Sequence, residues 1–156
     1  MRLMMMLGNR LNDLGVNTQN GPSLNVVVDV LRERAETLEE LAQKSMYFYE
    51  EFEAYEESAA KKHLRVVAEP MLTDLVVRFK EIGDWNAGRI HEAITDVAEM
   101  HDAKLGKIAQ PLRVAVSGVS ATPPIDVTVA LVGKAKTLQR LERALGYIRD
   151  RRHDNA

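Results

Sequence analysis

Hydrophobic residues recur at every third or fourth position along much of the chain. This spacing gathers them on one face of an α-helix and is typical of helices that pack against a core. It predicts helices over residues 24–31, 72–79, 90–97 and 138–148. Turn-forming residues separate the predicted helices at residues 15–22, 50–57, 83–86, 102–106 and 118–124. The pattern therefore indicates an all-α fold with short loops.

Two segments have the alternating pattern of β-strands, so the local pattern alone does not distinguish helix from strand. Residues 113–116 and 126–129 alternate and are rich in β-branched side chains, but no other alternating segment offers a pairing partner. Gly118 and Gly133 stand where the C-terminal caps of helices are expected. We therefore predict that both segments are helical.

Two threonines mark the predicted starts of helices. Thr37, followed by Glu40 three residues later, forms a capping box ahead of an apolar stretch. Thr122 precedes two prolines, which are favoured in the first turn of a helix because they need no hydrogen-bond acceptor there. A helix is expected to begin at each threonine.

Composition narrows the class of protein. The chain of 156 residues suffices for one domain or two small subdomains. It contains no cysteine, so it has no disulfide framework and no thiolate metal site, and the default location is the cytoplasm. No apolar run approaches the ~18 residues of a membrane helix, so no membrane partner is expected. The methionine-rich residues 1–7 are too short for a signal sequence and are expected to begin a helix, with the methionines in its core.

Charge is distributed unevenly along the chain. Residues 36–102 carry 16 acidic and 7 basic side chains, whereas residues 103–156 carry 10 basic and 4 acidic side chains. A basic end of this kind is able to face phosphate groups, because local potential governs encounter more than net charge does. Both regions also fit ordinary solvated helix faces, and charge alone favours that interpretation.

A search for catalytic and metal-binding motifs gives negative results. Thr95 stands where a zinc-protease helix beginning at His91 needs its second histidine. Ala135 follows Lys134, where a phosphate-binding loop needs serine or threonine. We therefore expect this chain to hold no metal and no cofactor.

One longer motif is more specific than these catalytic and metal-binding fragments. Residues 106–118, with the sequence GKIAQPLRVAVSG, resemble the C-terminal anticodon-binding region of bacterial glutamyl-tRNA synthetases. The similarity continues in register at residues 122–125, 132–134 and 138–141, and upstream at residues 20–22, 32–38, 47–50, 59–64 and 84–85. In all, it extends from about residue 15 to residue 149.

The resemblance implies an all-α fold of two small helical subdomains, residues 1–62 and residues 63–156, the first incomplete at its N-terminal side. It implies tRNA-Glu as the partner, together with the catalytic domain of the same synthetase, and no DNA. ATP and Mg would belong to that catalytic domain, whose signature motifs do not occur in this sequence. The chain is therefore expected to be the non-catalytic, anticodon-reading part of a class I ligase, either as a fragment or as a separately made domain.

The resemblance also implies particular anticodon contacts. Arg34 matches the family arginine that reads the third anticodon base, C36. Arg113 matches the family arginine at the pocket for the first base, at position 34. The loop of that pocket is matched by Thr122, Pro123 and Ile125.

Pro124 departs from the glycine or alanine of many relatives, which affects the backbone expected for the loop. Taken singly, Arg34 and Arg113 also fit surface arginines on helices, because such residues are common there. The alternative function is a helical protein-interaction module without RNA binding.

Overall fold

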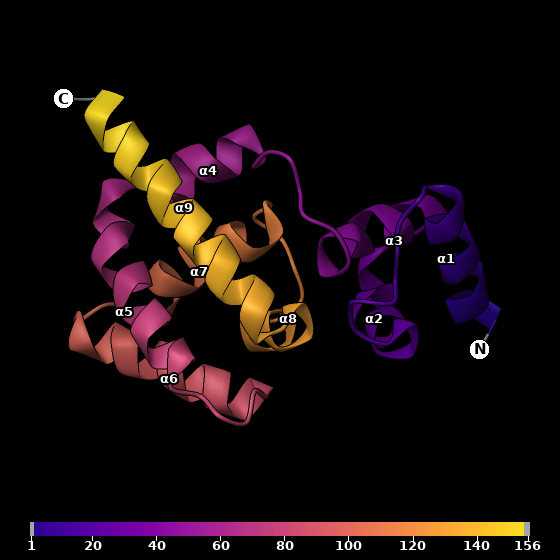
Figure 1. Ribbon diagram of the computed structural model, residues 1–156, viewed down its shortest axis with the longest axis horizontal. Coiled ribbons are helices and arrows are strands. Elements are labelled where there is room, and N and C mark those ends of the chain that lie inside the picture. Colours follow the sequence, from indigo (N-terminus) through magenta and orange to yellow (C-terminus); the bar gives the residue numbers. More distant parts are fainter. Residues whose placement is uncertain (1, 155–156) are drawn as a thin grey trace. The chain divides into compact units, whose positions relative to one another are not determined.

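The computed structural model describes residues 2–154, and this part of the chain consists of helices and connecting loops without strands. The all-α prediction is therefore confirmed. The chain forms two compact units, Met1–Glu53 and Ala54–Ala156 (Figure 1). No helix in the described range is long and apolar enough to cross a membrane.

The boundary between the units lies ahead of α4 (Glu57–His63), whereas the resemblance placed it after residue 62. Helix α4 packs against α7 (Leu105–Ser117) of the second unit. The backbone N–H of Glu56 also donates to the carbonyl oxygen of Gly118 at 2.8 Å. These contacts make α4 part of the second unit.

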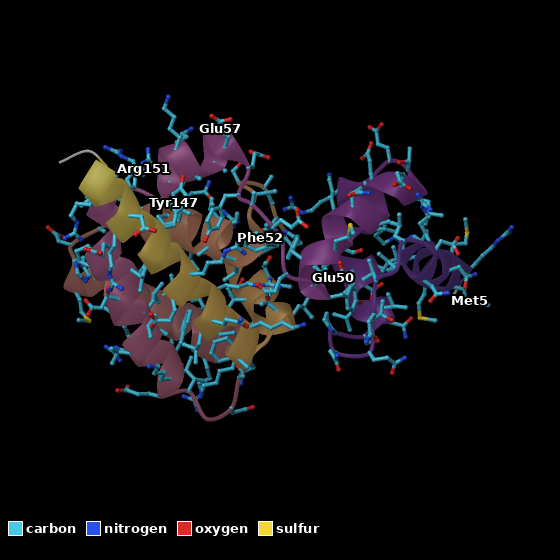
Figure 2. All side chains as sticks on the ribbon, turned by 45° about the horizontal axis from the view of Figure 1, so that its top comes forward. Met5, Glu50, Phe52, Glu57, Tyr147 and Arg151 are labelled. Atoms are coloured by element: carbon cyan, nitrogen blue, oxygen red, sulfur yellow. The ribbon has the colours of Figure 1, made fainter. Side chains whose placement is uncertain are left out.

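The first unit packs three helices around a small core. Its elements are α1 (Arg2–Asp13), α2 (Leu24–Leu31), the 3₁₀ turn η1 (Arg32–Arg34), α3 (Leu38–Ser45) and the 3₁₀ turn η2 (Met46–Phe48). Leu7 and Leu11 of α1 are fully buried. Met5 is 63% exposed (Figure 2) and Met6 is 42% exposed. The prediction that the methionines fill the core is therefore wrong for these two, because α1 buries its leucines instead.

The loop between α1 and α2 packs closely at Gly21 against Phe48 and Tyr49, near the C-terminal end of the first unit. A Cβ atom at residue 21 would lie 2.8 Å from the Phe48 carbonyl oxygen and closer still to the Tyr49 ring, so only glycine fits there. The Tyr49 hydroxyl donates to the carbonyl oxygen of Pro22 at 2.9 Å. Burial raises the pKa of the Tyr49 phenol to about 12.

This burial predicts a loss of stability at alkaline pH. The unfolded chain loses the Tyr49 proton near pH 10, whereas the folded protein keeps it until about pH 12. The stabilisation is therefore complete below pH 10 and is lost as the pH rises towards 12, by at most ~1.4 kcal/mol per pH unit. Urea denaturation across this range should show a smaller pH dependence for Tyr49→Phe than for the unaltered chain. Equal slopes for the two proteins would contradict the expectation.

The N-terminus of α3 confirms the predicted cap. The Thr37 hydroxyl oxygen accepts from the backbone N–H of Glu40 at 3.1 Å, and a Glu40 carboxylate oxygen accepts from the N–H of Glu36 at 3.2 Å. The carboxylate thus reaches one residue beyond the usual partner in a capping box.

Replacing Thr37 by alanine should therefore destabilise the first unit by ~1 kcal/mol, because an N-terminal N–H of α3 loses its acceptor. Thr37→Ser keeps the hydroxyl and should lose much less. Thermal unfolding followed by circular dichroism distinguishes the two, and equal losses would show that the hydroxyl does not cap α3.

The second unit is built around α7. Its elements are α4, the 3₁₀ turn η3 (Val66–Ala68), α5 (Glu69–Lys80), α6 (Ala87–Met100), α7, α8 (Ile125–Val132) and α9 (Lys134–Asp154). Helix α9 packs on α5, α7 and α8 and runs across them in Figure 1. Helix α6 covers α5, α7 and α8 from another side. From Ile108 onwards nearly every side chain of α7 is buried, so the neighbouring helices fix its position.

The two strand-like segments are helical, as predicted, and lie in α7 and α8. Gly118 ends α7 with a left-handed φ of 81°, and Gly133 ends α8 with φ of 93°. The prediction that Thr122 begins α8 is wrong: the helix starts at Ile125, with Pro124 at the capping position. The Thr122 side chain is engaged elsewhere, as described below.

Arg151 ties the end of α9 to α4 (Figure 2). Its Nη1 atom donates to the carbonyl oxygens of Ala60 and Leu64, each at 3.0 Å, and its Nη2 atom donates to that of Lys61 at 3.2 Å. Lys61 lies in the C-terminal turn of α4, where carbonyls lack partners within the helix, and Leu64 is the residue that follows the helix. The Ala60 carbonyl also accepts from the backbone N–H of Leu64 at 2.9 Å. The guanidinium of Arg151 therefore caps α4.

Candidate functional site

Arg113 and the loop after α7 come together in the second unit. Nε of the half-buried Arg113 donates to the hydroxyl oxygen of Thr122 at 2.8 Å. Gly118 reverses the chain after α7, so the loop returns alongside the helix that carries Arg113. Pro123 of this loop and Ile125, the first residue of α8, are buried, whereas Pro124 is exposed.

A second side chain holds the same guanidinium. Oε1 of Gln110 accepts from Nη1 of Arg113 at 2.5 Å. The two residues are three apart in α7 and therefore lie on one helix face. Sequence reasoning did not name Gln110 as a site residue, although this spacing was a signal for it. Together, Thr122 and Gln110 restrict the plane of the guanidinium.

Hydroxyl groups order the backbone of the loop. The Thr122 hydroxyl lies 2.8 Å from the carbonyl oxygen of Pro123, and the hydroxyl of Thr128 lies 3.0 Å from the same oxygen. Ser117 donates to the Arg113 carbonyl oxygen at 2.7 Å and accepts from the N–H of Val119 at 3.2 Å. Sequence reasoning missed Thr128, whose position became apparent only once α8 was packed behind the loop.

The positive charge of Arg113 acts electrostatically on His63, the last residue of α4. Burial lowers the pKa of His63, and the positive charges of Lys62 and Arg113 lower it further. An imidazole whose pKa lies below its ordinary value is largely neutral at pH 7. Arg113 and Lys62 therefore both contribute positive charge near His63.

Arg34 lies in the first unit, at the end of η1. Its side chain is exposed, and its carbonyl oxygen accepts from Nζ of Lys44. The predicted site residues thus divide between the units, with Arg34 in one and Arg113, Thr122, Pro123 and Ile125 in the other.

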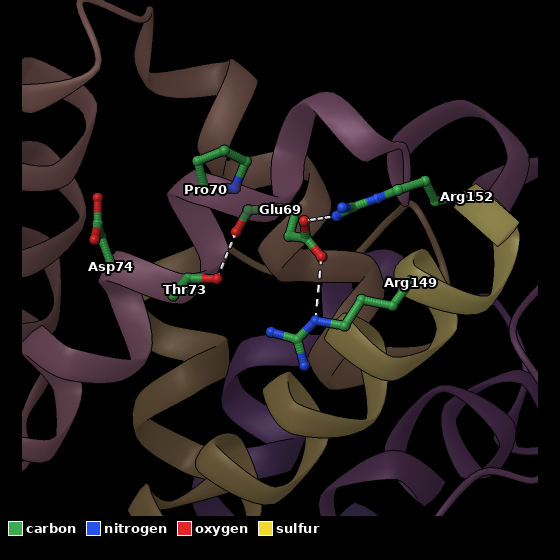
Figure 3. Close-up of a pocket in the computed structure, with 6 residues that line it drawn as sticks. All are labelled: Glu69, Pro70, Thr73, Asp74, Arg149 and Arg152. Atoms are coloured by element: carbon green, nitrogen blue, oxygen red, sulfur yellow. Dashed lines mark hydrogen bonds and ion pairs between the residues drawn. The ribbon is translucent and has the colours of Figure 1, made fainter. Parts of the chain in front are cut away.

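A separate surface pocket of about 550 Å³ lies between α5 and α9 (Figure 3). Its lining includes Glu69, Arg149 and Arg152. The Glu69 carboxylate accepts from Nε of Arg149 at 3.2 Å and also pairs with Arg152. Part of the basic charge of α9 is therefore neutralised within the protein.

Comparison with known proteins defines the class. A family model described as an anticodon binding domain matches residues 2–145. The chain therefore belongs to the anticodon-binding domain family.

Particular relatives are glutamate–tRNA ligases. Over 138 residues the chain is 51% identical to glutamate–tRNA ligase 1 of Nitrosococcus oceani, covering 88% of the chain and 29% of that protein. The fold matches a glutamate–tRNA ligase structure from Elizabethkingia meningosepticum, solved in complex with its amino acid, with a TM-score of 0.84 at 22% identity, over 94% of this chain and 29% of that one. A structure from Elizabethkingia anophelis gives a TM-score of 0.79 at 23% identity, over 93% and 28%. The chain thus spans less than a third of the length of these relatives.

Proposed function

We propose that this chain binds the anticodon of tRNA-Glu and so helps a glutamate–tRNA ligase to select its tRNA. Membership of the anticodon-binding domain family and the 51% identity to a glutamate–tRNA ligase support the proposal. The observation that carries it is the Arg113 guanidinium, held by Thr122 and Gln110 beside a loop stiffened by two prolines.

The chemistry of this site suits a splayed base. Cytosine presents the acceptors O2 and N3 on its pairing edge, and a guanidinium offers a planar set of donors that also stacks on bases. In the proposed pocket for the first anticodon base, Arg113 supplies charge-assisted donors and Thr122 a hydroxyl. Pro123 and Ile125 contribute apolar contact. Arg34 reads the third base from the first unit.

Catalysis is proposed to belong to another domain. Glutamate activation needs ATP and Mg, and this sequence lacks the phosphate-binding and signature loops for them. Among the described residues, no three His, Asp or Glu side chains form a group suited to a metal ion. The catalytic domain of the same synthetase is the proposed second partner, in the cytoplasm and without DNA or membrane.

An electrophoretic mobility shift tests the function directly. The chain is titrated against tRNA-Glu and an unrelated tRNA at two salt concentrations. We expect a shift that favours tRNA-Glu and weakens with salt, because phosphate contacts release counterions. Binding should be weak, since the contacts of the acceptor stem are not linked to this site. Equal absence of binding to both tRNAs would instead support the protein-interaction module.

Arg34→Gln should relax selection at the third anticodon base without unfolding the protein. The side chain is exposed, and the carbonyl that binds Lys44 is retained in the variant. In an enzyme carrying this domain, the preference for C36 over G36 should fall about tenfold, as for loss of one base contact. An unchanged preference would remove Arg34 from the proposed site.

A further inference from the structure

Thr128 lies directly behind the loop that carries Thr122. It is on α8, and its side chain is completely buried. Its hydroxyl oxygen is 3.0 Å from the carbonyl oxygen of Pro123 and 3.3 Å from the hydroxyl oxygen of Thr122. Two threonine hydroxyls and one carbonyl thus form a compact group beneath Arg113.

The two hydroxyl protons of this group are not both needed to satisfy the Pro123 carbonyl. Each threonine hydroxyl has a single proton, whereas a carbonyl oxygen accepts two hydrogen bonds. The Thr122 oxygen already accepts from Nε of Arg113, and both hydroxyls lie within donating distance of the Pro123 carbonyl. Either threonine alone therefore keeps that buried carbonyl paired.

This redundancy has a use when a ligand reaches Thr122. If the Thr122 proton turns outward, Thr128 still donates to the Pro123 carbonyl, so no buried acceptor is left unpaired. Without Thr128, the same rotation would leave that carbonyl unsatisfied. The single proton of the Thr122 hydroxyl would then be donated either to the Pro123 carbonyl or to the ligand, and the other acceptor would lose its hydrogen bond.

We propose that Thr128 is a positioning residue that releases the Thr122 hydroxyl to donate to an acceptor on a nucleobase, a ring nitrogen or a carbonyl oxygen. This inference rests on the proposed anticodon-binding function. If Thr128 served only in packing, loss of its hydroxyl would lower the stability of the free protein. Under this proposal, the loss leaves the stability of the free protein nearly unchanged and weakens tRNA binding.

The test compares Thr128→Val, which removes the hydroxyl at nearly constant shape, with Thr128→Ser, which keeps it. Trp85 donates to the carbonyl oxygen of Val129 at 3.3 Å and is the single tryptophan, so its fluorescence in urea reports whether α8 is intact. Affinity is measured with a tRNA-Glu transcript. Thr128→Ala serves as a second hydroxyl-free variant should valine disturb the packing.

We expect unfolding midpoints near that of the unaltered chain for both Thr128→Val and Thr128→Ser. Thr128→Val should bind the transcript about tenfold more weakly, the factor that corresponds to ~1.4 kcal/mol, whereas Thr128→Ser should bind normally. In a Thr122→Val background, Thr128→Val should have no further effect, because there is no Thr122 proton left to release.

Unchanged affinity in the hydroxyl-free variants would overturn the proposal. So would an equal loss in the Thr122→Val background, or a failure of Thr128→Ser to bind normally, because either result indicates packing alone. If the unaltered chain does not bind the transcript, the proposed function itself fails, and the role of Thr128 falls with it.

Discussion

Arg113→Ala is expected to weaken binding of tRNA-Glu by ~1 to 3 kcal/mol, the range for loss of a good base contact, which is roughly 5-fold to 150-fold. We expect it to be the largest single contribution to binding, because the guanidinium is held in place before the tRNA arrives. The loss should be accompanied by a changed preference at the first anticodon base. Affinities for transcripts altered at position 34 provide the measurement.

The control is Lys107→Ala. Lys107 is an exposed cation on α7, the helix that carries Arg113. A lysine that contacts only phosphate should weaken all tRNAs alike and reduce the salt dependence of binding. It is a better control than Arg149, whose charge is paired with Glu69. If both variants lose affinity equally for every first base, Arg113 acts only through its charge and the pocket is assigned wrongly.

Arg140→Ala should lower the free energy of unfolding of the second unit by ~3 to 5 kcal/mol. Arg140 is completely buried, and its Nη1 atom donates to the carbonyl oxygen of Val116 at 2.6 Å. Val116 lies in the last turn of α7, where carbonyls lack partners within the helix. Alanine would leave both a cavity and an unpaired carbonyl.

Urea denaturation followed by Trp85 fluorescence measures this loss. Gln139→Ala, at the exposed neighbouring position, should change stability by less than ~0.5 kcal/mol. Arg140→Lys should recover only part of the loss, because an ammonium cannot reproduce the planar set of donors. A loss for Arg140→Ala no greater than that for Gln139→Ala would show that the buried guanidinium adds nothing to stability.

Local signals in the sequence correctly predicted the positions of most of the helices. Residues 113–116 and 126–129 look like strands in isolation, yet the glycines at positions 118 and 133 placed them in helices, and α7 and α8 agree. Thr37 is the cap it was predicted to be. Thr122 is not, because Arg113 and the Pro123 carbonyl engage its hydroxyl instead of the first turn of α8.

The candidate site was only partly accessible to sequence reasoning. The resemblance supplied Arg113 and Thr122. Thr128 carried no signal of its own, because its role depends on which face of α8 packs behind the loop. The roles of Arg34 and Arg113 in reading bases remain predictions.

The sequence by itself determined the helical class, most helix positions and the family, because periodicity, caps and a matching motif are written in neighbouring residues. Only the tertiary structure decided that α4 belongs to the second unit, that Arg140 is buried and that Glu69 neutralises arginines 80 and 83 positions away. Arginine is ordinarily a surface residue, so burial of Arg140 cannot be read from its type. Burial and long-range pairing depend on which helix faces meet, and that is settled by packing of the whole unit rather than by any local pattern.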